Sequence, residues 1–327
     1  MAIMFNKEMV NTNLLPVSSD NSKSRIPYFD LAKGVCILLV VWFHLTEIFG
    51  VHTVFDTYLY AVRMPLYVFL SGLFFKSYGG IWQLVKKKTK RLLVPFCFFY
   101  LTTSVLLPIL LHKFCGIEFR TGDDWRLLYA FLTYDDYPNI PLWFLWALFM
   151  LNVSFYVLQR YIKSEVLLGL CCLGLSILLG NVLNLPASIS KAFGYFFFFY
   201  LGSLVHRRNL LDAMPVRFVF PAAFILFVVL GLFSPANDVL AFVQQILLSV
   251  VGVLSLLLLC KVIGHLPYVS YVGRYSIMLL VTHEPLIRVL SILHIDNIFV
   301  CFLLLAASYL LIIPFMRRYM PHVTAQT

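Results

Sequence analysis

The chain has 327 residues, of which 61% are hydrophobic and 12% are charged, with a net charge of +10 and a mean hydropathy of +0.89. Soluble globular domains carry roughly 25% charged residues, so this composition excludes a soluble globule and indicates a polytopic membrane protein. The positive charge does not indicate a nucleic-acid partner, because the basic residues form short clusters between apolar segments, as the orientation of membrane helices requires.

Apolar segments long enough to cross a bilayer follow one another along the chain. They are residues 28–48, 58–75, 92–111, 142–158, 166–185, 189–205, 216–233, 239–260, 271–290 and 298–315. We therefore expect an all-α, polytopic transmembrane helical bundle of about ten spanning helices. A single membrane domain, residues 25–318, would lie between polar tails at residues 1–24 and 319–327.

The distribution of lysine and arginine predicts the orientation of this bundle. If the N-terminus is cytoplasmic, the inner segments hold 18 of these residues and the outer segments hold four, which are Lys113, Arg120, Arg126 and Lys191. Cytoplasmic segments carry an excess of lysine and arginine, so the rule places both termini in the cytoplasm. We expect a multi-pass protein of the inner, cytoplasmic membrane. Its long outer segment, residues 112–141, mixes aromatic residues with aspartates, a composition typical of sugar-binding surfaces and equally of membrane interfaces.

The first apolar segment carries four ionisable residues, Asp30, Lys33, His44 and Glu47. Eleven positions separate Lys33 from His44, so on a helix their side chains point within about 20° of each other, about 16 Å apart along the axis. Asp30 precedes Lys33 by three positions and Glu47 follows His44 by three, which places all four on one face. Ionisable residues on such a face must line a cavity or the interior of the bundle, and they indicate a functional site.

Permanent cations precede the third apolar segment, and Arg25 adds another before the first. The run consists of Lys86, Lys87, Lys88, Lys90 and Arg91. Arginine suits bidentate contacts with phosphate, so these residues could bind a phosphorylated ligand at the inner mouth. A basic cytoplasmic loop is also what topology and anionic lipids select, and both interpretations stay open.

Further polar residues interrupt the second and ninth segments. Arg63 is a permanent charge inside an apolar segment and needs a partner, for which Glu47, Asp56 and Glu284 are candidates. Ser71 and the following glycine would let another helix backbone approach closely. We assign to an acceptor-binding or structural site five residues: Arg63, Ser71, Trp143, His283 and Glu284. The seven cysteines show no spacing typical of a metal site, and we expect no metal.

Four motifs, in order along the chain, resemble those of the integral-membrane acyltransferase family three. They are Asp30-Leu-Ala-Lys-Gly-Val with His44 eleven residues after Lys33, Arg63-Met-Pro-Leu-Tyr-Val-Phe-Leu-Ser71-Gly72, Lys87-Lys88-Thr-Lys90-Arg91-Leu-Leu-Val-Pro95, and Gly273-Arg-Tyr-Ser276-Ile-Met-Leu-Leu-Val-Thr-His283. The first matches a basic-x10-His signature, and the second is similar to the Met-Pro…Ser-Gly motif of the fucose-acetylase-like branch. Members of that branch commonly carry histidine where this chain has Arg63, which cannot act as a base.

The resemblance implies a membrane O-acyltransferase that moves an acyl group, most simply acetyl, from cytoplasmic acyl-CoA to a hydroxyl of a surface or lipid-linked glycan. Its partners would be acetyl-CoA as donor substrate, the saccharide acceptor and membrane lipids, with no permanently bound cofactor. A sugar hydroxyl attacks a thioester efficiently only when a positioned base removes its proton, and a neutral imidazole can do so. We expect His44 to be this base.

Glu47 would then orient the His44 ring, and a set of charged residues would bind the donor. The donor-binding candidates are Arg25, Asp30, Lys33, Lys88 and Arg91. Two alternatives stay open on the sequence. A multispan transporter or glycan flippase also needs polar faces inside a bundle, although the chain contains no inverted repeat. A scaffold subunit of an envelope complex would leave Lys33, His44 and Arg63 without a role.

Overall fold

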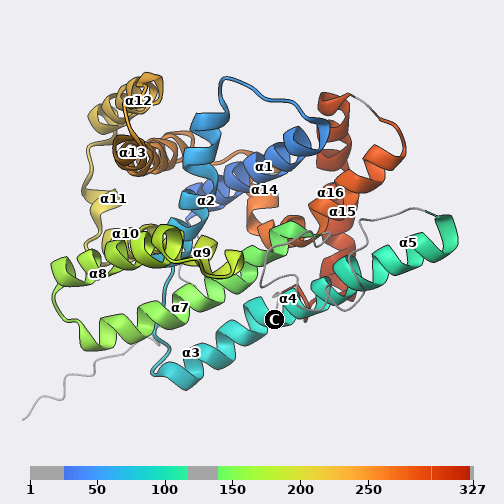
Figure 1. Ribbon diagram of the computed structural model, residues 1–327, viewed down its shortest axis with the longest axis horizontal. Coiled ribbons are helices and arrows are strands. Elements are labelled where there is room, and N and C mark those ends of the chain that lie inside the picture. The colour runs from blue at the N-terminus through green and yellow to red at the C-terminus, as the bar shows by residue number, and fades with distance from the viewer. Residues whose placement is uncertain (1–25, 117–138, 296, 325–327) are drawn as a thin grey trace, which may run out of the picture.

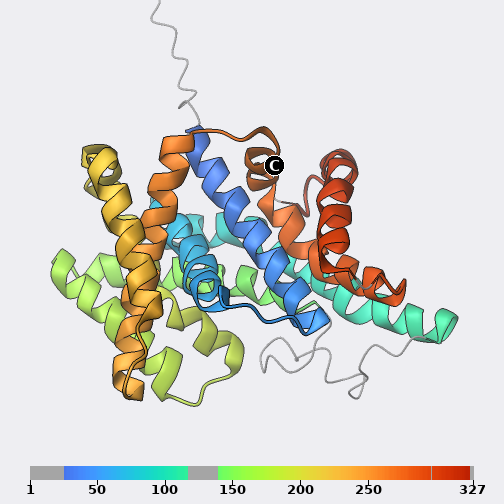
Figure 2. The ribbon, with the colours of Figure 1, turned by 90° about the horizontal axis from the view of Figure 1, so that it is seen from above.

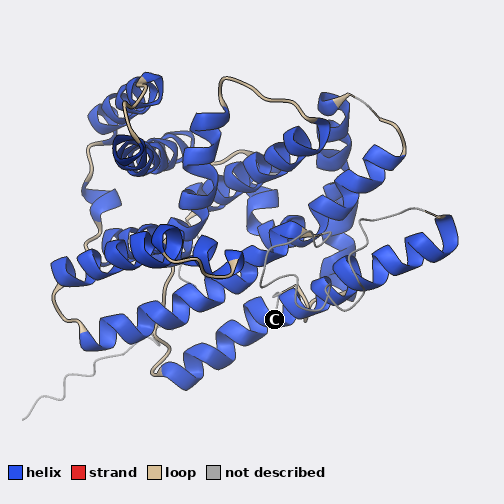
Figure 3. Ribbon diagram, in the orientation of Figure 1, coloured by secondary structure: helices blue, strands red, loops and turns tan. Residues whose placement is uncertain are grey.

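The computed structural model describes residues 26–116, 139–295 and 297–324 (Figure 1). Within these residues the regular structure is entirely helical and no strand occurs (Figure 3). The expected all-α fold is therefore confirmed. Arg25, the N-terminal tail and most of the 112–141 segment lie outside the described residues, so the donor-binding role of Arg25 stays a prediction.

The first part of the chain forms a hairpin and then one long, interrupted helix. Its elements are α1 (Pro27–Phe49), α2 (Asp56–Leu73), α3 (Ile81–Lys88), α4 (Val94–Phe99) and α5 (Leu107–Cys115), with π-helical segments at Thr89–Leu93 and Tyr100–Leu106. Proline at the first position of α1 suits its fixed backbone angle, and Gly50 ends the helix in the left-handed conformation, with φ of 63°. Because α1 is unbroken, Lys33 and His44 keep the helical relation that the sequence predicts.

The second part of the chain supplies the remaining helices. They are α7 (Trp143–Tyr161), α8 (Glu165–Ile177), α9 (Ala187–Gly194), α10 (Phe196–Arg207), α11 (Leu210–Ala213), α12 (Val216–Leu232), α13 (Asp238–Ile263), α14 (Pro267–Arg274), α15 (Ser276–Ile292) and α16 (Ile298–Tyr319). A single-turn 3-10 helix, Ile140–Leu142, precedes α7, and a π-helical segment, Leu178–Val182, follows α8. Asparagine side chains cap two of these helices: Asn237 accepts a hydrogen bond from the amide of Leu240, and Asn297 from the amide of Val300.

Seven helical segments of the described chain are long and apolar enough to cross a membrane, and the α14–α15 pair makes an eighth if it counts as one span. This pair is bent by 91°. The sequence-based expectation of ten also included α2 and α12. α12 has only 17 residues, and α2 is made less hydrophobic by Asp56, Arg63 and its tyrosines. The count of ten is therefore not confirmed, whereas a multi-pass membrane bundle is.

Helix α1 lies in the middle of the bundle, with α12 and α13 on one side and α15 and α16 on the other (Figures 1 and 2). Its closest neighbour is α14, and glycine makes the contact possible on both helices. A Cβ on Gly34 would lie 1.9 Å from the carbonyl oxygen of Val269, and a Cβ on Gly273 would lie 1.9 Å from that of Asp30. Such small residues let helix backbones touch in membranes. Two of the four sequence motifs therefore pack directly against each other.

A second glycine contact joins α2 to α10. A Cβ on Gly72 would lie 1.9 Å from the carbonyl oxygen of Phe199, and a Cβ on Gly202 would lie 2.0 Å from that of Phe69. The close backbone approach that the sequence predicts after Ser71 is thus observed. Together the two glycine contacts fix α1 and α2, the helices that carry His44 and Arg63, against the second half of the chain.

Candidate active site

The bend between α14 and α15 directs α15 along the second half of α1, where it meets His44. The Nδ1 atom of His44 lies 3.3 Å from Oε2 of Glu284, and the rings of His44 and His283 are 5.1 Å apart between centroids. The side chain of His44 is 15% exposed and that of Glu284 only 2%. The polar pair of the ninth apolar segment and the histidine of the first therefore form one buried group, which we call the histidine cluster: His44, His283, Glu284 and Arg288.

The carboxylate of Glu284 connects the two ends of this cluster. Its Oε1 atom accepts hydrogen bonds from Nη2 and Nε of Arg288, at 2.7 and 3.1 Å, while Oε2 faces His44. A buried carboxylate is costly without a cationic partner, and the guanidinium one helical turn away supplies it. The guanidinium of Arg288 thereby holds the Glu284 carboxyl group in place beside the imidazole. A carboxylate in this position orients the ring and stabilises the imidazolium that forms when a base accepts a proton.

His283 is completely buried and has a defined tautomer. Its Nδ1 atom lies 2.7 Å from the carbonyl oxygen of Leu279, and because a carbonyl oxygen can only accept, Nδ1 must carry the proton. The Nε2 atom is then an acceptor, and within the described residues it has no hydrogen-bond partner. An acceptor left open in a buried site next to a second histidine suits contact with a ligand or a water molecule.

Glu47, which the sequence places beside His44, lies elsewhere. Its side chain is exposed and lines a cavity of about 170 Å³ on the same side of α1, together with Asp56 and Arg63. In the described residues the carboxylate next to the His44 ring is that of Glu284. The sequence pattern predicted which face of α1 carries the ionisable residues. It did not predict which acidic side chain lies beside the imidazole.

Arg63 is buried on α2 and stacks on aromatic rings. Its guanidinium carbon lies 3.3 Å from the ring centroid of Phe43 and 5.3 Å from that of Tyr60. Phe43 is the chain neighbour of His44, so the guanidinium lies against the residue next to the histidine. Cation–π contacts of this kind stabilise a guanidinium in a weakly hydrated place. Arg63 therefore contacts Phe43, the residue that precedes His44 in the chain.

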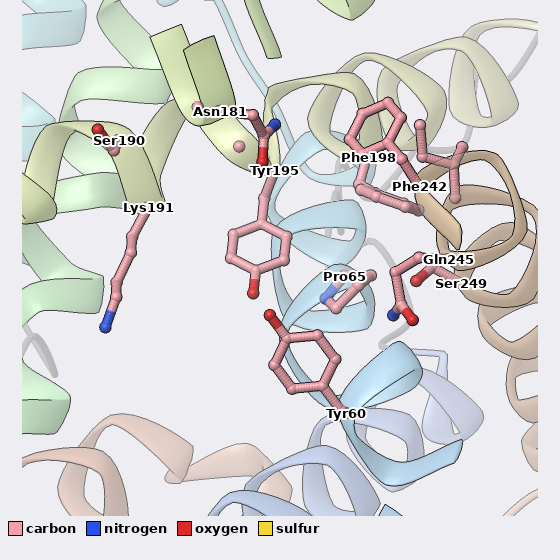
Figure 4. A pocket seen from close by; sticks show the side chains of 13 residues that line it. Tyr60, Pro65, Asn181, Ser190, Lys191, Tyr195, Phe198, Phe242, Gln245 and Ser249 are labelled. Atoms are coloured by element: carbon pink, nitrogen blue, oxygen red, sulfur yellow. The ribbon is translucent and has the colours of Figure 1, made fainter. Parts of the chain in front are cut away.

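A second cavity, of about 240 Å³, lies between α2, α9, α10 and α13 (Figure 4). Tyr60 lines both this cavity and the one beside Arg63, so the two flank the same ring. We call it the tyrosine cavity, because the side chains of Tyr60 and Tyr195 face each other across it (Figure 4).

The expected donor residues occupy two places. In α1, Asp30 is buried and the ammonium of Lys33 lies 4.5 Å from the ring centroid of Phe74. On α3 and the π-helical segment after it, a cavity of about 410 Å³, which we call the basic cavity, is lined by Gln83, Lys86, Lys87, Lys90 and Arg91. The segment from Phe74 to α3 links the two places, since Lys87 lies 4.4 Å from the ring of Tyr78. Lys88 does not line the basic cavity.

The two remaining expected residues, Ser71 and Trp143, lie on α2 and α7. Ser71 precedes the glycine that contacts α10, and Trp143 is buried at the start of α7, with its ring 5.9 Å from that of Phe144. Within the described residues no group of three or more His, Cys, Asp or Glu side chains could hold a metal ion.

The sequence interpretation missed two cations that the structure places at these sites. Arg288 follows Glu284 by one helical turn, a spacing that predicts an ion pair once Glu284 is singled out. Lys191 is an isolated lysine at the start of an apolar segment, and it was counted only as one of four outer charges. Its place in the wall of the tyrosine cavity depends on the packing of α9, which no local pattern reveals.

Comparison with known protein families gives one match. The model of an acyltransferase domain, that of acyltransferase family 3, matches residues 26–317 and so covers nearly all of the chain. Comparison with curated proteins and with solved structures finds no match.

Proposed function

The chain belongs to acyltransferase family 3, and from this we propose that it is a membrane O-acyltransferase that uses acyl-CoA, most simply acetyl-CoA, to acylate a hydroxyl of a surface or lipid-linked glycan. The donor would enter from the cytoplasm and the acceptor from the other side of the inner membrane. The observation that carries the proposal is the contact between His44 and Glu284, which joins two motifs of the family in one buried group.

The His44 imidazole acts as the general base. Oε2 of Glu284 lies 3.3 Å from Nδ1 of the ring and favours the tautomer in which Nδ1 carries the proton, which leaves Nε2 with a lone pair for the acceptor hydroxyl. As the hydroxyl oxygen forms a bond to the thioester carbonyl, Nε2 takes its proton. When the carbon–sulfur bond breaks, the thiolate of CoA leaves and recovers that proton, so the products are the ester and free CoA. Glu284 is a positioning residue in this scheme, and Arg288 holds it.

The basic cavity is the proposed place for the phosphates of CoA. Its four cations, Lys86, Lys87, Lys90 and Arg91, gather without an acidic side chain among the lining residues. Lysine and arginine side chains bind phosphate through charge-assisted hydrogen bonds. The thioester arm would then pass the Phe74 ring and Lys33 toward His44, along the face of α1 that bears both residues.

The test is transfer by the purified full-length chain in lipid nanodiscs. Radiolabelled acetyl-CoA is supplied with a panel of neutral, acidic and lipid-linked saccharides, and labelled ester is separated from free acetate. Label should appear on at least one saccharide with wild-type protein and not with His44→Gln. Transport of a saccharide into proteoliposomes, with no ester formed in the presence of donor, would instead establish the transporter alternative.

A further inference from the structure

The tyrosine cavity has a size and a shape that suit one small ligand. Its volume of about 240 Å³ lies below the roughly 300–1,000 Å³ typical of sites for drug-sized molecules, so it fits a single sugar ring better than an extended chain. Helix α2 contacts both α10 and α13 at this place, and Figure 4 shows side chains from α2, α9, α10 and α13 around the cavity.

Several polar side chains line this space between apolar helices. Tyr60 and Tyr195 contribute rings with hydroxyls at their tips, while Asn181, Gln245 and Ser249 contribute amide and hydroxyl groups. Aromatic rings provide flat apolar surface and a polar handle, and amides can donate and accept at once. This combination matches the alternating C–H faces and hydroxyls of a sugar.

Two of these groups have no use within the fold. Gln245 and Ser249 lie one turn apart on α13 and both line the cavity, next to Pro65 of α2 (Figure 4). Neither the Gln245 amide nor the Ser249 hydroxyl has a hydrogen-bond partner within the described residues, although Ser249 is only 3% exposed. The neighbouring Gln244, by contrast, donates to the carbonyl oxygens of Leu230 and Phe233. Polar groups kept open in a buried wall indicate that a ligand satisfies them.

Charge defines the ligand further. Lys191 lines the cavity, and the other lining residues in the described part of the chain are uncharged. A lysine within an apolar span marks a functional site and attracts an anion. Tyr60 lines both this cavity and the one that Arg63 and Phe43 line, so the tyrosine cavity lies next to the residue that precedes His44.

We infer that the tyrosine cavity is the acceptor site, and that the acceptor is an anionic saccharide whose carboxylate or phosphate is bound by Lys191 and whose hydroxyls are bound by Gln245 and Ser249. This inference rests on the proposed function for the direction of transfer. Tyr60 separates the cavity from Arg63, which stacks on Phe43 beside His44. A saccharide held there would extend past Tyr60 toward the base.

Equilibrium binding tests the site without any acyl transfer. Saturation-transfer NMR on the full-length chain, in the absence of acyl-CoA, compares three probes: methyl glucuronide, glucose 1-phosphate and methyl glucoside. At least one anionic probe should bind at least 10-fold more tightly than the neutral one. Lys191→Gln should remove that preference, and Gln245→Leu should weaken all three probes, whereas Lys163→Gln, a change at an exposed lysine between α7 and α8, should alter none.

The outcomes separate the two anions and the two proposals. Preference for the phosphate probe alone identifies a glycosyl phosphate, as in a lipid-linked saccharide, and preference for the uronate alone identifies an acidic glycan. Equal binding of all three probes, or an unchanged preference in Lys191→Gln, overturns the anionic ligand. Unchanged binding in Gln245→Leu overturns the cavity as the site. Absence of acyl transfer by wild-type protein would refute the proposed function and leave these binding results standing.

Discussion

The histidine cluster and the basic cavity are both rich in charge but neutralise it in opposite ways. In the histidine cluster, one buried carboxylate lies between a guanidinium and an imidazole, and every group has a fixed position. In the basic cavity, lysines and an arginine gather at an exposed surface with no acid among the lining residues. Buried, paired charges depend strongly on geometry, whereas exposed charges act additively and are screened by salt. This difference agrees with the roles that we propose, catalysis in the first region and binding of the CoA phosphates in the second.

The largest effect is expected at the base itself. His44→Ala should reduce transfer by roughly 10²- to 10⁴-fold, the usual contribution of one positioned proton acceptor, while CoA binding stays nearly unchanged. His44→Gln keeps a hydrogen-bond donor but cannot accept the proton at neutral pH, so it should be equally inactive. Steady-state transfer and equilibrium CoA binding measure the two quantities. Near wild-type turnover by His44→Gln would move the base elsewhere, and His283 would be the next residue to change.

The second effect distinguishes Glu284 from Glu47. Glu284→Gln preserves the shape of the side chain but removes the charge that orients His44 and pairs with Arg288, so kcat should fall on the order of 10²-fold, as when a reacting group is misplaced by about 1 Å. The donor KM should change little. Glu47→Gln removes the exposed acid of the same helix face and should cost much less. If Glu47→Gln lowered kcat more than Glu284→Gln, the sequence-based role of Glu47 would be restored.

The Glu284→Gln variant also breaks the ion pair with Arg288, so its expression level and its unfolding temperature must be measured alongside its activity. Removing one partner of such a pair costs about 3–5 kcal/mol of stability, which could itself lower activity. In the double variant Glu284→Gln, Arg288→Met no guanidinium is left unpaired, so stability should recover while kcat stays low. Recovery of both would make Glu284 a purely structural residue.

The third effect should be moderate and sensitive to salt. Lys87→Gln combined with Lys90→Gln should raise the donor KM several-fold and leave kcat nearly unchanged, because phosphate contacts far from the thioester bind substrate and transition state alike. The difference from wild type should shrink as ionic strength rises. Lys88→Gln is the matched control, since this lysine belongs to the same run but does not line the cavity. An unchanged KM in the double variant would reduce the run to a topology signal.

The smallest effect concerns the rim of the cavity beside Arg63. Hydrogen bonds from the amide and hydroxyl of Thr53, at 3.0 and 2.6 Å, lower the pKa of Asp56. A carboxylate with a lowered pKa stabilises the folded state above its ordinary range and loses this contribution as the pH falls through the folded value. Asp56→Asn should therefore unfold at a slightly lower temperature than wild type at pH 7, with the difference vanishing in acid. A difference independent of pH would assign the effect to packing.

Local pattern was sufficient for the helices and for the polar face of α1, because helical periodicity depends only on residues close in sequence. It placed Lys33 and His44 on one face of α1 and predicted the close backbone approach at Gly72. It did not identify Glu284 as the partner of His44, since that contact depends on the bend at Tyr275 and on the backbone contact between Gly34 and Val269. By local spacing, Glu47 was the better candidate, because it follows His44 by three residues. In the folded chain Glu284 lies beside the ring instead.

The same limit explains the other differences. Hydropathy counted α2 as an ordinary span, although Arg63 lines one of the cavities beside it and Tyr60 lines two. The sequence analysis grouped Lys88 with the donor-binding candidates because it belongs to the basic run. In the structure it does not line the basic cavity, since successive residues of a helix point in different directions. Lys191 could be found only by knowing that α9 packs near α2, which requires the three-dimensional arrangement.

The contact between α1 and α14 also dictates when activity can arise during synthesis. Helix α1 emerges first, but the helix that packs on its glycine, and the glutamate that orients its histidine, belong to the last quarter of the chain. A nascent or truncated polypeptide thus contains His44 without the carboxyl group that lies beside its ring in the folded chain. If His44 is the base that we propose, acyl transfer can begin only after α15 has been synthesised and has packed against α1.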